Sequence, residues 1–379
     1  MQSKIKLLVT ARDPASANDI AQVLPYLINS ERFIVKVLAQ GSAYSILLDG
    51  KTGSNVFEID FIPSIGDISH EHIENILNEV FLIFQPDSLL TGISGPDYGV
   101  DEISLNICSR YRSVKSFSIQ SYWGDINKSC GALADTIFVL DEFACKVTTK
   151  RNSDCKTVIT GSLQSNRYDN FDVKSERSAF RLEYGVKDDA LIIALFGQPL
   201  FEYEWYRTTL DLFIQSVNKS IQHARIIYKP HPKETDESIN WVSEKLSLSA
   251  IEFSVIQDIN TLTLLAGTDV TVSLFSTVGY DLQNLLYRSK KSFSIPVYLF
   301  FDKDCVTWFQ ENCCLDEIPL SKNDMSVLIT DKKKVSYFIS EAMTRQQRDK
   351  CSHNIKFFLK NLSKNPEDIV MQRILEELV

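Results

Sequence analysis

Residues 224–234 read ARIIYKPHPKE, and residues 271–281 read TVSLFSTVGYD. Each stretch begins as an apolar β-strand and ends in polar residues suited to holding phosphate. The first exit places His231 between two prolines, which restrict the backbone. The second carries Ser276, Thr277 and Gly279 at the start of an expected helix, whose unpaired N–H groups attract anions. Two such loops in one half of the chain predict a diphosphate or phosphodiester site.

The segments on both sides of these loops alternate between strand-like and helix-like patterns. We predict strands at residues 5–10, 33–39, 55–59, 88–91, 115–120, 136–140 and 158–161, and again at 190–196, 251–255, 269–275 and 294–300. This alternation is typical of parallel-sheet α/β folds. A polar segment at 162–175 separates the two series, and predicts two doubly wound, Rossmann-like domains.

The expected domains span residues 1–165 and 166–354. A C-terminal helix from about 355 to 379 is expected to pack back on the first domain. Ligands of such sheets bind beyond the carboxyl ends of the strands, so we expect the site in a cleft between facing domains.

Composition excludes several classes of protein. The 379 residues, 44% of them hydrophobic, fit two globular domains. The formal net charge of −9 argues against a general nucleic-acid binder. The eight cysteines form no CxxC pair or zinc-ligand spacing. With no signal sequence and no apolar run long enough to span a membrane, we expect a cytoplasmic protein.

The second domain supplies the expected phosphate-binding groups. His231 is expected to donate a hydrogen bond to a phosphate oxygen, either as a neutral imidazole or as an imidazolium. Lys229 would neutralise the same group, and Gly197 and Gln198 after the first strand of the domain would add backbone donors. The structural alternatives are a histidine that caps a sheet edge, a lysine without a functional role on its strand, and a Ser/Thr N-cap with a tight turn.

The first domain supplies carboxylates in the loop GISGPDYGVDE at residues 92–102. Asp97, Asp101 and Glu102 are candidate general bases. The alternative is a solvated acidic loop in which Asp101 or Glu102 opens the following helix. Arg12, Asp13 and Asn18 are candidate acceptor contacts, with turn residues as the alternative. Asp125 is a further candidate residue of the cleft.

A metal-independent reaction is expected. Neither an Asp-x-Asp arrangement nor a convincing cluster of metal ligands is present, so histidine, lysine and a helix N-terminus would stabilise the developing charge. The only small molecule implied besides the acceptor is a nucleotide-sugar co-substrate, with no separate cofactor.

The expected two-domain fold and its site motifs resemble the GT-B class of glycosyltransferases, and most of all bacterial enzymes that transfer ulosonic acids, such as sialic acid or Kdo, from CMP. The resemblance rests on the Lys-Pro-His-Pro sequence at 229–232, on Ser-Thr-x-Gly at 276–279 and on the acidic loop. It implies that His231, Ser276 and Thr277 hold the nucleotide phosphate while Asp97, Asp101 or Glu102 deprotonates the acceptor hydroxyl, with inversion at the anomeric carbon.

The implied partners are a CMP-linked donor and a glycan or lipid-linked acceptor of the bacterial surface, in capsule or lipopolysaccharide biosynthesis. A peripheral association with the inner face of the membrane is compatible with such an acceptor. Similar motifs and folds also occur in UDP-GlcNAc 2-epimerases and in CDP-glycerol or CDP-ribitol phosphotransferases. A third alternative is a non-catalytic nucleotide- or glycan-binding module.

Overall fold

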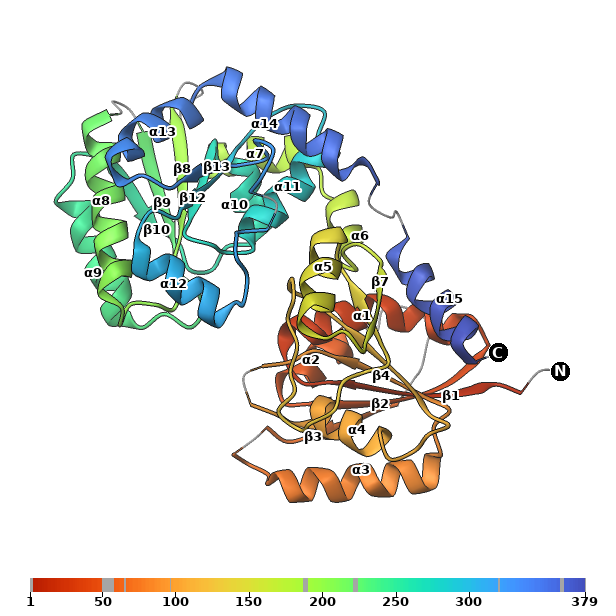
Figure 1. Ribbon diagram of the computed structural model, residues 1–379. Helices are drawn as coiled ribbons and strands as arrows, with labels where there is room; N and C mark the ends of the chain where they lie inside the picture. Colours follow the sequence, from red (N-terminus) through yellow and green to blue (C-terminus); the bar gives the residue numbers. More distant parts are fainter. Residues whose placement is uncertain are drawn as a thin grey trace. The chain divides into compact units, whose positions relative to one another are not determined.

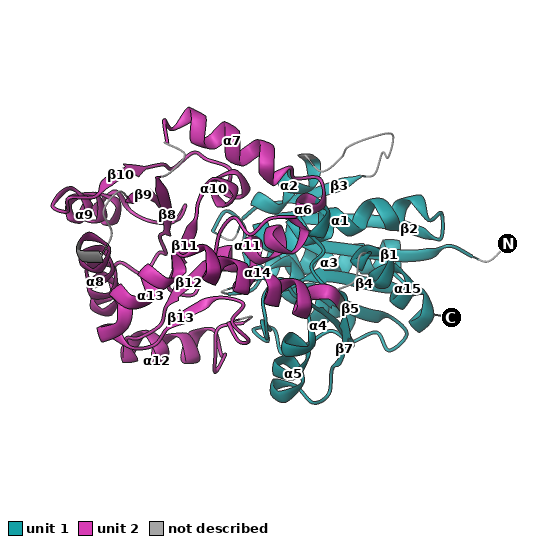
Figure 2. Cartoon of the chain, turned by 90° about the horizontal axis from the view of Figure 1, so that it is seen from above, with its two compact units in different colours: residues 1–166, 362–379 teal, residues 167–361 magenta. Residues whose placement is uncertain are grey.

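The computed structural model describes residues 3–49, 58–64, 66–95, 97–186, 190–220, 224–319, 321–361 and 365–378. The chain divides into two units, shown in different colours in Figure 2: Met1–Asn166 with Leu362–Val379 form unit 1, and Arg167–Asn361 form unit 2. Each unit contains one sheet in which all neighbouring strands run parallel, flanked by helices (Figure 1). The predicted α/β class with two Rossmann-like domains is confirmed.

Unit 1 has a seven-stranded sheet in the order β3-β2-β1-β4-β5-β6-β7. Its strands are β1 (Ile5–Ala11), β2 (Phe33–Gln40), β3 (Ile59–Ile62), β4 (Ser88–Gly92), β5 (Lys115–Ile119), β6 (Thr136–Val139) and β7 (Lys156–Ile159). The helices are α1 (Pro14–Asn29), α2 (Ser42–Asp49), α3 (His70–Phe84), α4 (Val100–Cys108), α5 (Glu142–Arg151) and α15 (Pro366–Leu378), and α6 (Ser165–Asp169) crosses the division. Every residue of the central strand β4 is buried, as expected for a parallel strand covered on both faces.

The last helix belongs to unit 1 because its apolar side joins the unit 1 core. Val370 and Ile374 of α15 are completely buried and pack in the same cluster as Leu24, Leu27 and Phe117. Near the end of the helix, Thr136 donates a hydrogen bond of 3.1 Å to Glu377. The chain therefore returns to its first unit after completing the second.

Unit 2 has a six-stranded sheet in the order β10-β9-β8-β11-β12-β13. Its strands are β8 (Leu191–Phe196), β9 (Ala224–Lys229), β10 (Glu252–Val255), β11 (Val270–Ser273), β12 (Pro296–Leu299) and β13 (Val327–Ile329). The helices are α7 (Val173–Glu183), α8 (Glu204–Ser220), α9 (Asp236–Ser247), α10 (Thr261–Gly267), α11 (Val278–Arg288), α12 (Lys303–Asn312), α13 (Val335–Ala342) and α14 (Arg345–Phe358), with 3-10 turns at Lys332–Lys334 and Leu359–Asn361.

Both sheets reverse their winding direction at one point. In unit 1 the reversal lies between β1 and β4, and in unit 2 it lies between β8 and β11. At such a reversal the connections leave in opposite directions, which opens a crevice beyond the carboxyl ends of the two strands. We call this side of each sheet its carboxyl edge, and the opposite side its amino edge.

Three predicted boundaries differ from the structure, and one observed strand has no predicted counterpart. The expected strand at 55–59 is observed as β3 from Ile59, and residues 55–57 lie outside the described residues. The three-residue strand β13 was not predicted. The helical spacing of Ile20, Val23, Leu24 and Leu27 predicts a helix from about residue 19, whereas α1 begins at Pro14, because proline is favoured in the first turn. The C-terminal region contains α14 within unit 2, so the returning helix starts at Pro366 and not near 355.

No helix among the described residues is long and apolar enough to cross a membrane.

Candidate functional site

The carboxyl edge of unit 2 brings three loops to adjacent strand ends. The loops follow β9, β8 and β11, and β8 lies between the other two strands. His231 follows β9, Gly197 and Gln198 follow β8, and Ser276 follows β11. The residues that the sequence analysis grouped around a phosphate therefore leave three neighbouring strands at the same edge of one sheet.

His231 lies in a turn that defines its protonation. Its Nδ1 atom accepts a hydrogen bond of 3.1 Å from the backbone N–H of Lys233. A neutral imidazole that accepts at Nδ1 carries its proton at Nε2, which can donate to an anion. Burial, followed by the charge of Lys233, lowers the pKa of His231 below its usual value. The structure thus supports a neutral donor and argues against the imidazolium form considered from the sequence.

Glu234 fixes this turn, although the sequence analysis did not select it. Its Oε2 atom accepts from the backbone N–H of His231 at 2.7 Å, and its Oε1 atom accepts from the hydroxyls of Tyr228 at 2.6 Å and Ser238 at 2.7 Å. Gly197 leaves room for this carboxylate, because a Cβ atom there would lie 1.9 Å from Glu234 Oε2. The glycine of the β8 exit is thereby explained by packing against Glu234.

Gln198 joins the two strands at the reversal of the sheet. Its side-chain oxygen accepts from the backbone N–H groups of Leu274 at 3.1 Å and Phe275 at 3.3 Å. Its own backbone N–H donates to the hydroxyl of Tyr206 at 2.8 Å. Since this N–H is already bonded, Gln198 positions the loop after β11 instead of offering the backbone donor expected from the sequence.

The loop after β11 presents the N-terminus of α11. Thr277 is the N-cap residue and is exposed, and its side chain makes no capping hydrogen bond. Ser276 Oγ accepts a long hydrogen bond of 3.4 Å from the N–H of Val278. Both hydroxyls and the first turn of an 11-residue helix are thus at the carboxyl edge, where the helix dipole favours an anion.

Gly279 and Lys229 have local structural roles that the sequence did not indicate. A Cβ atom at buried Gly279 would lie 1.9 Å from the Tyr298 hydroxyl, so the glycine allows α11 to pack against β12. Lys229 Nζ donates to the carbonyl oxygen of Gln257 at 2.9 Å, and burial lowers the pKa of its ammonium group.

The carboxyl edge of unit 1 contains the second group of candidates. Loops after β1, β4 and β5 leave three adjacent strands. Asp101 is fully buried in the first turn of α4, where its oxygens accept from Thr10 at 2.6 Å and Ser94 at 2.8 Å. Burial, reinforced by the neighbouring Glu102 charge, raises the pKa of Asp101.

The carboxylate of Glu102 is also hydrogen-bonded within unit 1. It accepts from the backbone N–H of Gly99 at 2.8 Å and from Asn127 at 3.0 Å, and it lies 3.5 Å from Arg12 Nε. Burial raises its pKa, and Arg12 opposes that shift. The alternative role for Asp101 and Glu102, opening the following helix, is what the structure shows. With these oxygens bonded internally, direct proton abstraction from a substrate by either residue requires a rearrangement.

Asp97 and Asp13 lie in other settings at this edge. Asp97 is exposed and has a positive φ of 67°, and its carbonyl oxygen accepts from Asn127 at 2.7 Å and from Arg12 at 3.3 Å. Asp13 occupies the N-cap position of α1 without a capping hydrogen bond from its side chain, and its Oδ2 atom accepts from Gly95 N–H at 2.9 Å. Its Oδ1 atom is buried and makes no hydrogen bond with any described residue.

Asp125 has the acid–base property expected of a catalytic carboxyl group. Burial and the nearby Asp13 charge raise its pKa to about 6, and Arg151 opposes the shift. Asp13 and Asp125 are therefore two interacting carboxyl groups beyond β1 and β5. Asn18, in contrast, lies inside α1, where its side chain donates to the Pro14 carbonyl at 2.8 Å, so it is not the turn residue that the sequence offered as an alternative.

Solved structures match almost the whole chain, whereas no protein-family model and no curated protein sequence matches it. The S. aureus MnaA–UDP structure has a TM-score of 0.68 at 12% identity, covering 99% of this chain and 98% of that one. UDP-GlcNAc 2-epimerase from Neisseria meningitidis, bound to UDP-GlcNAc, has a TM-score of 0.64 at 12% identity over 98% and 100% of the chains. A glycosyltransferase from Rickettsia africae has a TM-score of 0.67 at 12% identity over 99% of both.

The fold is that of the GT-B class. The predicted GT-B fold is thereby confirmed. The more specific prediction of a CMP-ulosonic acid transferase finds no support, since the similar structures include complexes with UDP and UDP-GlcNAc. Identities near 12% establish the fold alone.

Proposed function

We propose that this protein is an enzyme acting on a UDP-linked sugar, and specifically that it inverts C2 of a UDP-N-acetylhexosamine. Unit 2 binds the nucleotide diphosphate in this proposal, and unit 1 supplies acid–base groups. The observation that carries it is the grouping of His231, Ser276 and the α11 N-terminus at one carboxyl edge. The UDP and UDP-GlcNAc complexes among the similar structures favour uridine diphosphate over CMP.

The diphosphate would be held by neutral and dipolar groups. The Nε2–H of His231 donates to one phosphoryl oxygen, and the hydroxyls of Ser276 and Thr277 contact another at the positive end of the α11 dipole. These contacts strengthen as the diphosphate gains charge while its bond to sugar C1 breaks.

Inversion at C2 requires removal of the C2 proton and its return on the opposite face of the sugar. Loss of the proton together with the C1–O bond gives an unsaturated sugar and UDP, and the reverse addition restores the C1–O bond. Asp125 suits the removal of this proton, because burial and the nearby Asp13 charge raise its pKa to about 6, and it accepts a proton above that pH. We assign Asp101 and Glu102 the role of positioning the α4 loop.

The test is proton exchange at C2. In D2O, wild-type protein with UDP-GlcNAc is expected to replace the H-2 signal with deuterium and to form the C2 epimer, both followed by proton NMR. Asp125→Asn should lose both signals, and Asp154→Asn, a change at an exposed aspartate of unit 1, should keep them. If the wild-type protein shows neither H-2 exchange nor formation of the C2 epimer, the proposal is contradicted.

Glycosyl transfer is the second candidate, favoured by the similarity to the R. africae glycosyltransferase. It predicts no H-2 exchange and a release of UDP that depends on an added acceptor. The acceptor and the peripheral membrane association expected from the sequence belong to this second candidate.

A further inference from the structure

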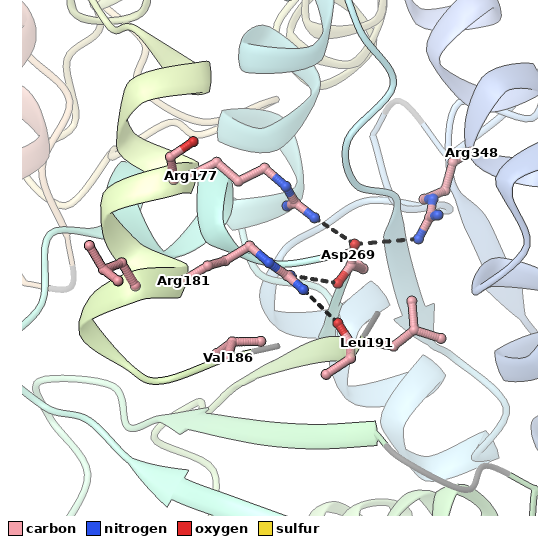
Figure 3. A pocket seen from close by; sticks show the side chains of 9 residues that line it. Arg177, Arg181, Val186, Leu191, Asp269 and Arg348 are labelled. Atoms are coloured by element: carbon pink, nitrogen blue, oxygen red, sulfur yellow. Dashed lines mark hydrogen bonds and ion pairs between the residues drawn. The ribbon is translucent and has the colours of Figure 1, made fainter. Parts of the chain in front are cut away.

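A pocket of about 560 Å³ lies at the amino edge of the unit 2 sheet, away from the loops described above (Figure 3). Leu191 at the start of β8 and Asp269 just before β11 line it, whereas Gln198 and Ser276 follow the opposite ends of the same two strands. A strand of six residues such as β8 spans roughly 20 Å. The pocket is therefore separate from the candidate donor site.

Three arginines surround a single carboxylate in this pocket. Arg177 and Arg181 approach Asp269 from α7, and Arg348 approaches it from α14 (Figure 3). The distances from the Asp269 oxygens are 2.6 Å to Arg177 Nη2, 3.3 Å to Arg181 Nη1 and 3.5 Å to Arg348 Nη1. Asp269 also accepts the backbone N–H of Ile192 at 2.9 Å, so its oxygens accept hydrogen bonds from three donors and form an ion pair with Arg348.

The arginines differ in how well their donors are satisfied. Arg177 also donates to the carbonyl oxygens of Ala266 at 2.9 Å and Thr268 at 2.8 Å, and Arg181 donates to Ala190 at 2.7 Å. Arg348 reaches only ion-pair distance from Asp269. Its Nε and Nη1 atoms are buried, yet neither makes a hydrogen bond with any described residue.

This arrangement is costly without a further anion. The Arg348 side chain is only 15% exposed, so water replaces few of its missing partners. Burial lowers the pKa of Arg177, Asp269 opposes the shift, and the Arg181 and Arg348 charges add to it. An anion in the pocket would accept from Arg348 and reduce the repulsion among the guanidinium groups. Guanidinium groups bind phosphate in this way, with paired planar N–H donors.

We propose that this pocket, which we call the Arg348 pocket, binds a small phosphorylated anion. Its volume accommodates a phosphate group with an attached sugar or nucleoside. The ligand would contact α7 and α14 and the amino ends of β8 and β11. It would thus bind unit 2 at a place distinct from the donor loops and independently of the reaction proposed above.

Isothermal titration of the full-length protein with inorganic phosphate and with pyrophosphate tests the proposal, with sodium chloride used to match ionic strength. We expect saturable binding that Arg348→Gln weakens at least tenfold. Arg345→Gln, the same change on the same helix at a side chain that is 89% exposed, should bind as the wild type does. His231→Ala should also keep this binding, which separates it from any anion held by the donor loops.

A second readout covers the case in which Arg348→Gln does not fold. In wild-type protein, the Nε–Hε signal of Arg348 in a nitrogen–proton NMR spectrum should shift during the phosphate titration. The proposal is overturned if the wild type binds neither anion, if His231→Ala abolishes all binding, or if folded Arg348→Gln binds as tightly as Arg345→Gln. No shift of the Arg348 signal at saturation would overturn it as well.

Discussion

Glu234 Oε2 accepts the backbone N–H of His231 at 2.7 Å, and the same carboxylate joins the hydroxyls of Tyr228 and Ser238. One side chain thus connects the end of β9, the turn of His231 and the first turn of α9. Because the turn is fixed from behind, the imidazole is positioned before any ligand arrives. Preorganisation of this kind reduces the free energy that binding must spend on ordering the site.

Replacing Glu234 with alanine should destabilise unit 2 and weaken nucleotide binding together. Three donors lose their acceptor, and each buried unsatisfied group costs about 1–3 kcal/mol. We expect the free energy of unfolding in urea to fall by about 2 kcal/mol or more. Glu237→Ala, at an exposed position in the first turn of α9, is the control. Equal stabilities of the two variants would contradict the role given to Glu234.

The imidazole of His231 should titrate below the ordinary histidine range. Its burial and the Lys233 charge both disfavour the protonated form. The Cε1 proton signal of His231, assigned by its loss in His231→Ala, gives the pKa directly in an NMR titration of the free protein. A midpoint above 6.5 would show that the imidazolium dominates more of the pH range than the structure implies.

Asp125 should set the acidic limb of the pH–rate profile. A carboxylate that removes a proton is active above its pKa, which burial and Asp13 raise to about 6. The value of kcat/KM is therefore expected to rise with pH through about 6. Asp13→Asn removes the neighbouring charge and should move this limb to lower pH. Loss of the general base in Asp125→Asn should lower turnover by roughly 10²–10⁴-fold. A limb that stays in place in Asp13→Asn contradicts the coupling.

Asp101 should make the protein less stable as the pH rises. Its folded pKa is raised by burial, so between the unfolded value near 4 and the folded pKa the native state holds a proton that the unfolded chain has lost. The free energy of unfolding must fall with increasing pH across this window. Asp101→Asn should flatten the fall, whereas exposed Asp97→Asn should leave it unchanged. Parallel curves for wild type and Asp101→Asn would rule out this contribution.

The α/β class was accessible from the sequence because apolar strands and amphipathic helices have different periods. The buried strands β1 and β8 contain short apolar runs, whose length of six or seven residues and β-branched side chains favour a strand over a helix. Strand β13 has only three residues, too few to show a period. Its place is set by pairing with β12, a contact between distant parts of the chain.

The candidate site was accessible only in part. Motifs at strand exits predicted that His231, Ser276 and Thr277 lie at one edge of the unit 2 sheet. A motif does not show which hydrogen bonds a side chain makes. Gln198, Asp101 and Glu102 are polar residues whose hydrogen bonds are made within the fold, and the partners that show this are far away in sequence. Glu234 had a local signal, since it follows the Pro-His-Pro turn, but its three hydrogen bonds appear only in three dimensions.

The central claim is that the carboxyl edge of unit 2 binds a uridine diphosphate. Calorimetric titration of the wild-type protein and of His231→Ala with UDP, CDP and CMP tests it most directly. We predict that UDP binds more tightly than CMP, and that His231→Ala loses about tenfold or more of the UDP affinity, the effect of one charge-assisted hydrogen bond. A preference for CMP, or an unchanged UDP affinity in folded His231→Ala, would contradict this account.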